Sequence, residues 1–382
     1  MLHLIFIALL VPLPLIQVGG FTSGLYLYHI LSFIMFGIVF IEAIKNNFKI
    51  KYDKESFLLF CYIIFIFVLS GVNLTKEWII ALLSFFCFFS SNLYAANSKY
   101  NIEEVRKLSK YYLLIISVLG VSSYLNNNYL YINPYILGEE GSDDFIFTGF
   151  LGLTRGSIGV IFPILISLTL IDFYKNNLKD KIIISFAILA TIICILLSGS
   201  RTGLFLCLIA IVLNFLLFRS KSIGIIITVA TSLLIILIPY FYDFINLDRF
   251  NDIGSSYSVE SRKQVQSWTL QYIFNNFHQF IFGMGYDSKL FIKSIKHELT
   301  HPHNEFLYTI WSVGIVGFVL YLMFLYNNYY KSDARYKKNI LIIYMIFFVG
   351  SMSVGSILTP SLRLAYLGFF GFFLIKTFRK IS

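Results

Sequence analysis

Five arginines that flank apolar segments or lie in a long polar segment offer the most distinctive chemistry in the sequence. All five fall on one side of the membrane in the topology derived below, and they are Arg155, Arg201, Arg249, Arg262 and Arg363. Guanidinium groups gathered at one depth would bind a pyrophosphate at a membrane surface through bidentate, charge-assisted hydrogen bonds. Any one arginine beside an apolar segment could instead reach lipid headgroups, so only the group as a whole indicates an anion site.

Arg201 lies in a short polar link, Ser-Gly-Ser-Arg-Thr-Gly at 198–203, between two apolar segments. Small residues allow a ligand to approach the backbone closely, which suits an anion site. Glycine and serine serve a tight turn equally well, and the arginine would then face lipid. Both interpretations of this link are open at this point.

A second polar cluster, His-Pro-His-Asn-Glu at 301–305, precedes another apolar segment. The unperturbed pKa of histidine is near neutrality, so a histidine here could act as general base toward a sugar hydroxyl or hold an acceptor. Pro302 suits the first turn of a helix, which would put His303 and Asn304 near exposed amide groups that favour anions. The alternative role for His301 and His303 is a polar helix cap.

The same cluster could supply metal ligands, but no cysteine or further ordered acidic ligand accompanies the histidines. Structural and catalytic metal sites need such a complete ligand set. An acidic pair that would hold Mg²⁺ for a nucleotide sugar is not evident either. We therefore expect neither a metal nor a cofactor.

The composition predicts an all-α polytopic integral membrane protein. Of the 382 residues, 58% are apolar and 13% are charged, and the mean hydropathy is +0.77. This leaves too little polar surface to cover a soluble globule. Apolar runs long enough to cross a bilayer predict about 12 transmembrane helices, at 2–19, 24–44, 56–73, 77–96, 110–125, 157–174, 181–197, 203–219, 222–242, 304–326, 339–357 and 362–378. The net charge of +10 comes without a basic stripe interleaved with aromatics, so no nucleic acid is expected as a partner.

The loop charges predict the orientation. With both termini in the cytoplasm, the inner loops and their flanks hold 20 of the 30 lysines and arginines, as the positive-inside rule requires. The chain then divides into transmembrane helices 1–9 over 1–242, a large outer loop over 243–303, and helices 10–12 over 304–382. Long loops commonly carry function, so we expect the functional face to be the non-cytoplasmic one.

Within the large loop, the spacing predicts an amphipathic helix over 259–277 that ends before Gly283-Met284-Gly285. Its expected apolar face comprises Val265, Trp268, Tyr272 and Ile273. This helix could lie on the outer leaflet. Beyond the loop, Gly314 and Gly317 are expected to serve close helix packing.

These motifs together resemble the O-antigen ligase and O-antigen polymerase superfamily of bacterial envelope glycosyltransferases. Ser200-Arg201 is similar to that family's Ser-Arg element after the seventh span. His303-Asn304, nine residues and then Gly314-x-x-Gly317 are similar to its histidine signature. In the loop, Ser261-Arg262 to Trp268 with Gly283 to Gly285 resembles a further element. The resemblance covers 198–317, and the N-terminal half is similar only in hydropathy and topology.

The resemblance implies a glycan donor on undecaprenyl pyrophosphate and transfer without metal or nucleotide. It implies that Arg201 and Arg262 bind the leaving pyrophosphate and that His303 activates or positions the acceptor hydroxyl. We expect His301 and Asn304 to assist in binding substrate. Arg155 and Arg363 are included among the substrate-binding residues because of their predicted depth alone.

The expected function is an O-antigen polymerase of the bacterial inner membrane, which joins lipid-linked repeat units at the periplasmic face. Its expected partners are the lipid-linked oligosaccharide, the glycan acceptor, the bilayer and a chain-length regulator. An O-antigen ligase that transfers the glycan to lipid A core is the alternative with the same residues. A lipid-linked oligosaccharide flippase is the alternative of another class, although ionisable residues within its spans would then be expected and are nearly absent.

Overall fold

The protein is helical over almost all the residues that its structure describes. The computed structural model describes residues 2–10, 14–17, 24–47, 57–58, 61, 64, 76–97, 102–126, 155–197, 200–217, 257–285, 288–296, 302 and 304–354. The N-terminal elements are α1 (Leu2–Leu10), β1 (Pro14–Gln17), β2 (Gly24–Tyr26), α2 (Leu27–Lys45), α4 (Lys76–Asn97) and α5 (Ile102–Asn126). The later elements are α7 (Arg155–Thr169), η1 (Phe173–Lys175), α8 (Leu178–Leu197), α9 (Arg201–Leu217), α12 (Tyr257–Asn275), α13 (Phe277–Phe282), α14 (Ser288–Ile295), α15 (Glu305–Tyr330) and α16 (Lys337–Val354).

The first predicted span, 2–19, is wrong. The helix there ends at Leu10, and Pro14–Gln17 pairs antiparallel with Gly24–Tyr26. Prolines stand at 12 and 14, and a proline disfavours helical geometry in the residue before it. The short strand pair is therefore an addition to the expected all-helical architecture.

Two described helices are long and apolar enough to cross a membrane, Leu178–Leu197 and Phe306–Tyr330. Gly159–Thr169 and Thr202–Phe215 are apolar but shorter. The helices observed near eight of the other predicted spans begin and end within a few residues of the expected limits, except that α5 starts eight residues early. The predicted spans 222–242 and 362–378 lie outside the described residues, and so does most of 56–73. The total of twelve spans stays a prediction.

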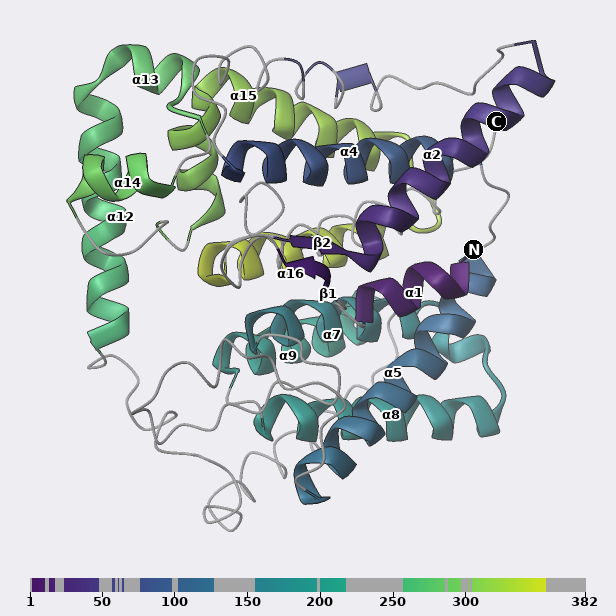
Figure 1. The fold of residues 1–382 in the computed structure, drawn as a ribbon. Helices are drawn as coiled ribbons and strands as arrows, with labels where there is room; N and C mark the ends of the chain where they lie inside the picture. The colour runs from purple at the N-terminus through teal and green to yellow at the C-terminus, as the bar shows by residue number, and fades with distance from the viewer. Residues whose placement is uncertain are drawn as a thin grey trace.

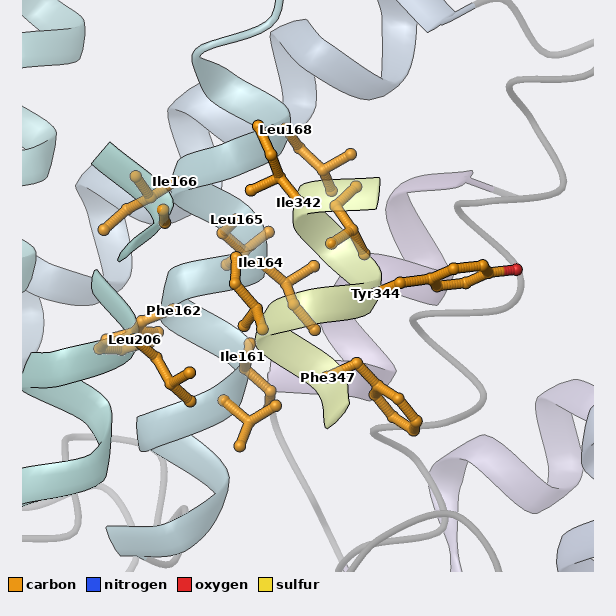
Figure 2. Close-up of a cluster of buried hydrophobic side chains, with 14 of the residues drawn as sticks. Ile161, Phe162, Ile164, Leu165, Ile166, Leu168, Leu206, Ile342, Tyr344 and Phe347 are labelled. Carbon is orange, nitrogen blue, oxygen red and sulfur yellow. The ribbon is translucent and has the colours of Figure 1, made fainter. Parts of the chain in front are cut away.

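Helix α7 lies at the centre of the bundle. Every residue from Val160 to Leu170 is buried, including Pro163 and the polar residues Ser167 and Thr169. Figure 2 shows Ile164 and Leu168 of α7 beside Ile342 of α16, and Leu206 of α9 on the other side. A helix that is apolar on all sides is expected only where neighbours cover it completely.

Helices α7 and α9 run parallel, and α16 runs antiparallel to both. Near their ends, Asn214 Nδ2 donates to Ser167 Oγ at 3.4 Å, and Asn339 Nδ2 donates to Asn214 Oδ1 at 3.4 Å. Near the opposite ends, Gly350 of α16 packs against Val160 and Leu206. The three helices are thus joined by polar contacts at one level and by close packing at another.

Several segments predicted as cytoplasmic loops meet at one end of the bundle. Arg106 Nη1 donates to the Ile171 carbonyl at 3.2 Å, and Lys110 pairs with Asp180 across α5 and α8. Asp333, which is buried, pairs with Arg335 at 2.8 Å. The charge of Arg335 also interacts with that of Asp172, so the starts of α5, α8 and α16 lie at the same end of the bundle.

The buried asparagine pair should contribute measurable stability. We expect Asn214→Ala and Asn339→Ala each to lower the unfolding temperature in detergent. The double variant should lose less than the sum, with a coupling energy of about 0.6 kcal/mol, because each change removes the same interhelical bond. Exposed Asn126 hydrogen-bonds only within its own helix, so Asn126→Ala serves as the control. Strictly additive losses would show that the pair is not coupled.

Candidate active site

Two arginine-led helices begin side by side at the end of the bundle opposite the ion pairs. Arg155 is the first residue of α7 and Arg201 the first of α9. Because the two helices are parallel and in contact near these starts, their unpaired backbone N–H groups lie at one level. The partial positive charges at the starts of α7 and α9 therefore reinforce each other.

Two glycines allow this close approach. A Cβ on Gly159 would lie 2.6 Å from Ser200 Oγ and 3.2 Å from the Cα of Gly203. The Ser200 hydroxyl also accepts from the Gly203 N–H at 3.2 Å, which caps the start of α9. The link at 198–203 thus combines a serine cap with a glycine contact to α7. Sequence reasoning did not single out Gly159, although its position four residues after Arg155 in Arg-Gly-Ser-Ile-Gly marks a small residue near a helix start.

The start of α15 holds the histidine signature. Asn304 is the N-cap, and its Oδ1 accepts from the Leu307 N–H at 3.2 Å. Pro302 was expected in the first helical turn, which is wrong, because the helix begins at Glu305 and the asparagine takes the capping position. His301 and His303 lie outside the described residues.

Helix α12 brings Arg262 beside this segment. Gln266 Nε2 donates to the Pro302 carbonyl at 3.1 Å, and Arg262 lies one turn earlier on the same face of α12. Arg262 is half-buried, and burial lowers the pKa of its guanidinium from the ordinary value. An arginine nevertheless keeps its charge at neutral pH. Among the carboxylate side chains that the structure describes, which do not include those of Glu260 and Glu305, none pairs with Arg262. A partly desolvated cation therefore lies one turn from the contact with Pro302.

The predicted apolar face of α12 is confirmed, but it contacts protein. Val265 and Ile273 are buried, and Trp268 and Tyr272 pack against the core. These four side chains are therefore not available to the outer leaflet. The helix itself runs from Tyr257 to Asn275, close to the predicted limits.

The starts of α7, α9 and α15 lie at the same end of the bundle. Phe306, two residues after Asn304, stacks on Phe348 of α16 with ring centroids 5.5 Å apart. Gly350, two residues further along α16, packs against Val160 of α7 and Leu206 of α9. Figure 1 shows α12, α13 and α14 at one end of the bundle. The structure thus brings the backbone positions of Arg155 and Arg201 to the same end as Arg262 and Asn304, while Arg363 lies outside the described residues.

A break in α15 connects the large loop to the bundle. Gly314 has φ 65° and ψ −176° in the middle of the helix, so the carbonyls of the preceding turn lose their usual partners. The N–H of Met284 donates to the Trp311 carbonyl and that of Gly285 to the Ser312 carbonyl, both at 2.8 Å. We call this pair of bonds the glycine clasp. Sequence reasoning predicted close packing at Gly314 but not the break.

The close backbone approach beside the glycine clasp requires glycine at positions 283 and 314. Gly283 has φ 80°, and a Cβ there would meet the Ser312 and Val313 backbone. A Cβ on Gly314 would meet the backbone of Ile281 and Phe282. The two backbones therefore touch directly, and this contact fixes α13 on the broken helix.

We expect Gly314→Ala to destabilise the protein strongly. A positive φ combined with a ψ near 180° is almost restricted to glycine and costs about 1–3 kcal/mol for an alanine, and the backbone clash adds about 1–3 kcal/mol. Gly283→Ala should act similarly, and both should speed hydrogen exchange at the Met284 and Gly285 amides. Gly37→Ala in α2 is the matched control, because a Cβ there meets nothing within 4 Å. Equal unfolding temperatures for Gly37→Ala and Gly314→Ala would contradict the clasp.

Metal ligation is not suggested by the described residues, which include no group of three His, Cys, Asp or Glu side chains placed to hold an ion. The undescribed histidines at 301 and 303 lie outside that search. The described part of the site consists instead of a half-buried cation, helix starts and an amide cap. Such groups hold and orient an anion.

Comparison with known proteins found a family match in the central and C-terminal part of the chain. Residues 186–322 match the family model described as O-Antigen ligase. The match begins in α8 and ends in α15, so it includes Arg201, Arg262, the glycine clasp and the histidine signature. No curated protein matched the chain.

The family match indicates a membrane-bound, glycosyltransferase-like enzyme of polysaccharide biosynthesis with lipid-linked glycan substrates. It does not support the flippase alternative, because the matched family is one of enzymes that transfer glycans. Both results agree with the motifs quoted from the sequence. Over residues 186–322 the chain is therefore similar to the O-antigen ligase family, and this match supports the resemblance to the superfamily of O-antigen ligases and O-antigen polymerases.

Proposed function

We propose that this protein is a surface-polysaccharide polymerase. It transfers a glycan from undecaprenyl pyrophosphate to a sugar hydroxyl of another lipid-linked repeat unit, at the periplasmic face of the bacterial inner membrane. In this proposal both termini are cytoplasmic, and the end with the ion pairs around Lys110 and Asp180 faces the cytoplasm. A chain-length regulator is a possible further partner.

The observation that carries the proposal is the half-buried Arg262 with no described carboxylate partner, beside the histidine signature. Removing a cation from water without an acidic partner costs free energy, which a bound anion would recover. The positive starts of α7 and α9 lie at the same end of the bundle. A pyrophosphate attached to a membrane lipid carries the negative charge that would neutralise these groups, and it lies at the depth of the lipid headgroups.

In the proposed reaction, the oxygen of the acceptor hydroxyl attacks the anomeric carbon of the donor glycan. A new glycosidic bond forms while the bond to the pyrophosphate oxygen breaks, and that oxygen takes the electron pair. Arg201 and Arg262 stabilise the charge that develops on the leaving group. The acceptor's proton goes to the imidazole of His303, which acts as general base or holds the hydroxyl in position.

The remaining predicted residues have supporting roles in this proposal. Arg155 and Arg363 contribute positive charge at the depth of the pyrophosphate, and His301 and Asn304 help to hold the acceptor. Asn304 already uses its side-chain oxygen to cap α15, so its donor group is the part that would face a sugar. The pyrophosphate is itself a good leaving group, and the transfer therefore needs no nucleotide and no metal.

A ligase is the second candidate, because the matched family model is described as O-Antigen ligase. The donor and the catalytic residues would be the same, and only the acceptor would differ. The abundance of Phe, Ile, Asn, Tyr and Lys in the sequence favours the polymerase by association. A host that lacks the protein distinguishes the two: single-unit caps remain if a polymerase is lost, and no caps remain if a ligase is lost.

The first test is complementation of a surface-polysaccharide-deficient host, with membrane levels checked and the polysaccharide ladder run on a gel. We expect Arg201→Ala and Arg262→Ala to lower transfer by about 10²–10³-fold, because each removes a donor to the leaving group. His303→Ala should lower it by about 10²–10⁴-fold. Wild type should restore the long-chain ladder, and all three variants should leave single-unit caps.

Lys263→Ala is the matched control, since this exposed neighbour of Arg262 on α12 carries the same charge and faces away from the core. It should restore the full ladder. If the ladder survives Arg201→Ala and His303→Ala at normal membrane levels, the assignment of catalytic residues is wrong. Complete absence of caps in the uncomplemented host would select the ligase instead.

A further inference from the structure

Exposed apolar side chains gather where α12 turns into α13. Leu270 is 43% exposed, Phe274 70% and Phe277 76%. We call these three residues the α12–α13 corner. The exposed residues nearer the start of α12 are polar, namely Lys263, Gln264 and Ser267. The apolar exposure is therefore confined to one end of this helix, and such a patch marks a contact surface.

The corner is attached directly to a helix that is suited to cross the membrane. The glycine clasp fixes α13 on α15 at Gly314, and Phe306–Tyr330 is one of the two described helices long and apolar enough for a span. Just past the clasp, the exposed residues of α15 are apolar and recur at helical spacing. They are Val316, Val319, Leu322, Met323 and Tyr326. A lipid-facing stripe thus starts next to the corner.

The orientation of α12 suits a position along the membrane surface. Figure 1 shows α12 crossing one end of the bundle, transverse to α4, to α16 and to the long part of α15. If the long part of α15 spans the bilayer, α12 lies parallel to its plane. Its core-facing side is already covered by protein, so only its exposed residues can meet lipid.

We propose that the α12–α13 corner inserts into the acyl boundary of the leaflet next to the candidate site. Apolar side chains on a surface-parallel helix enter this layer by about 5–10 Å, and the burial of phenylalanine favours this position. The inserted corner anchors the far end of α12. Arg262, near the start of the same helix, is thereby held at the height of the lipid headgroups, where a lipid-linked pyrophosphate lies.

The part of this proposal that concerns Arg262 rests on the proposed function, but the insertion itself does not. Insertion is a property of the full-length protein in a bilayer and can be measured without any substrate. A failed insertion and a failed reaction are therefore separate results.

The test is tryptophan fluorescence of Phe277→Trp and Phe274→Trp in nanodiscs that hold one protein copy each. Brominated phospholipids quench a tryptophan that contacts their acyl chains. After subtraction of the wild-type signal from the three native tryptophans, we expect at least about twofold stronger quenching at Phe277→Trp than at the control Gln264→Trp. Val319→Trp on the apolar stripe of α15 gives the reference for full lipid contact.

Lipids with bromine near the headgroup end of the chain should quench Phe277→Trp more than lipids with bromine near the chain end. Equal quenching at Phe277→Trp and Gln264→Trp would overturn the proposal. A blue-shifted but unquenched emission at Phe277→Trp would also overturn it, because it would show that protein covers the corner. Intact α12 packing is checked by unchanged unfolding temperatures, since both phenylalanines are exposed.

Discussion

The break in α15 at Gly314 is the constraint on which the arrangement of the site depends. An α-helix interrupted near a membrane leaves carbonyls that must find new donors, since lipid offers none. The Met284 and Gly285 amides supply these donors from the large loop. The amides of the loop and the carbonyls of the broken helix therefore satisfy each other's hydrogen bonds. The break also lets Phe306 contact both Phe318 and Phe348, because the two parts of α15 need not share an axis.

A second backbone contact has the same physical basis at the start of α7 and α9. Gly159 and Gly203 bring the two helices together where both still have unpaired N–H groups. Between helices in a membrane, close packing of small residues replaces the hydrophobic driving force that acts in water. The glycines have no functional side chain, but they allow α7 and α9 to pack closely at their starts. This packing places the backbones of Arg155 and Arg201, the first residues of the two helices, at the same depth.

Charged side chains are paired differently at the two ends of the bundle. At the end predicted to be cytoplasmic, Lys110 pairs with Asp180 across α5 and α8, and Arg335 pairs with Asp333 within one loop. At the other end, Arg262 is half-buried and has no partner among the carboxylate side chains that the structure describes. A partly desolvated guanidinium is suited to bind an anion through charge-assisted hydrogen bonds. This difference separates the structural end from the candidate active end.

The sequence alone determined the helical membrane character, most described helix limits, the resemblance to the O-antigen ligase family and the apolar face of α12, because hydropathy, periodicity and short motifs are local properties. It failed at the first span, where prolines end α1, and it placed Pro302 inside a helix that begins at Glu305. Only the tertiary structure decided that α7 and α9 are parallel, that Arg262 lies near Pro302, and that Gly314 breaks a helix. These features depend on contacts between segments far apart in the chain, and the fit of one backbone against another leaves no periodic signal in the sequence.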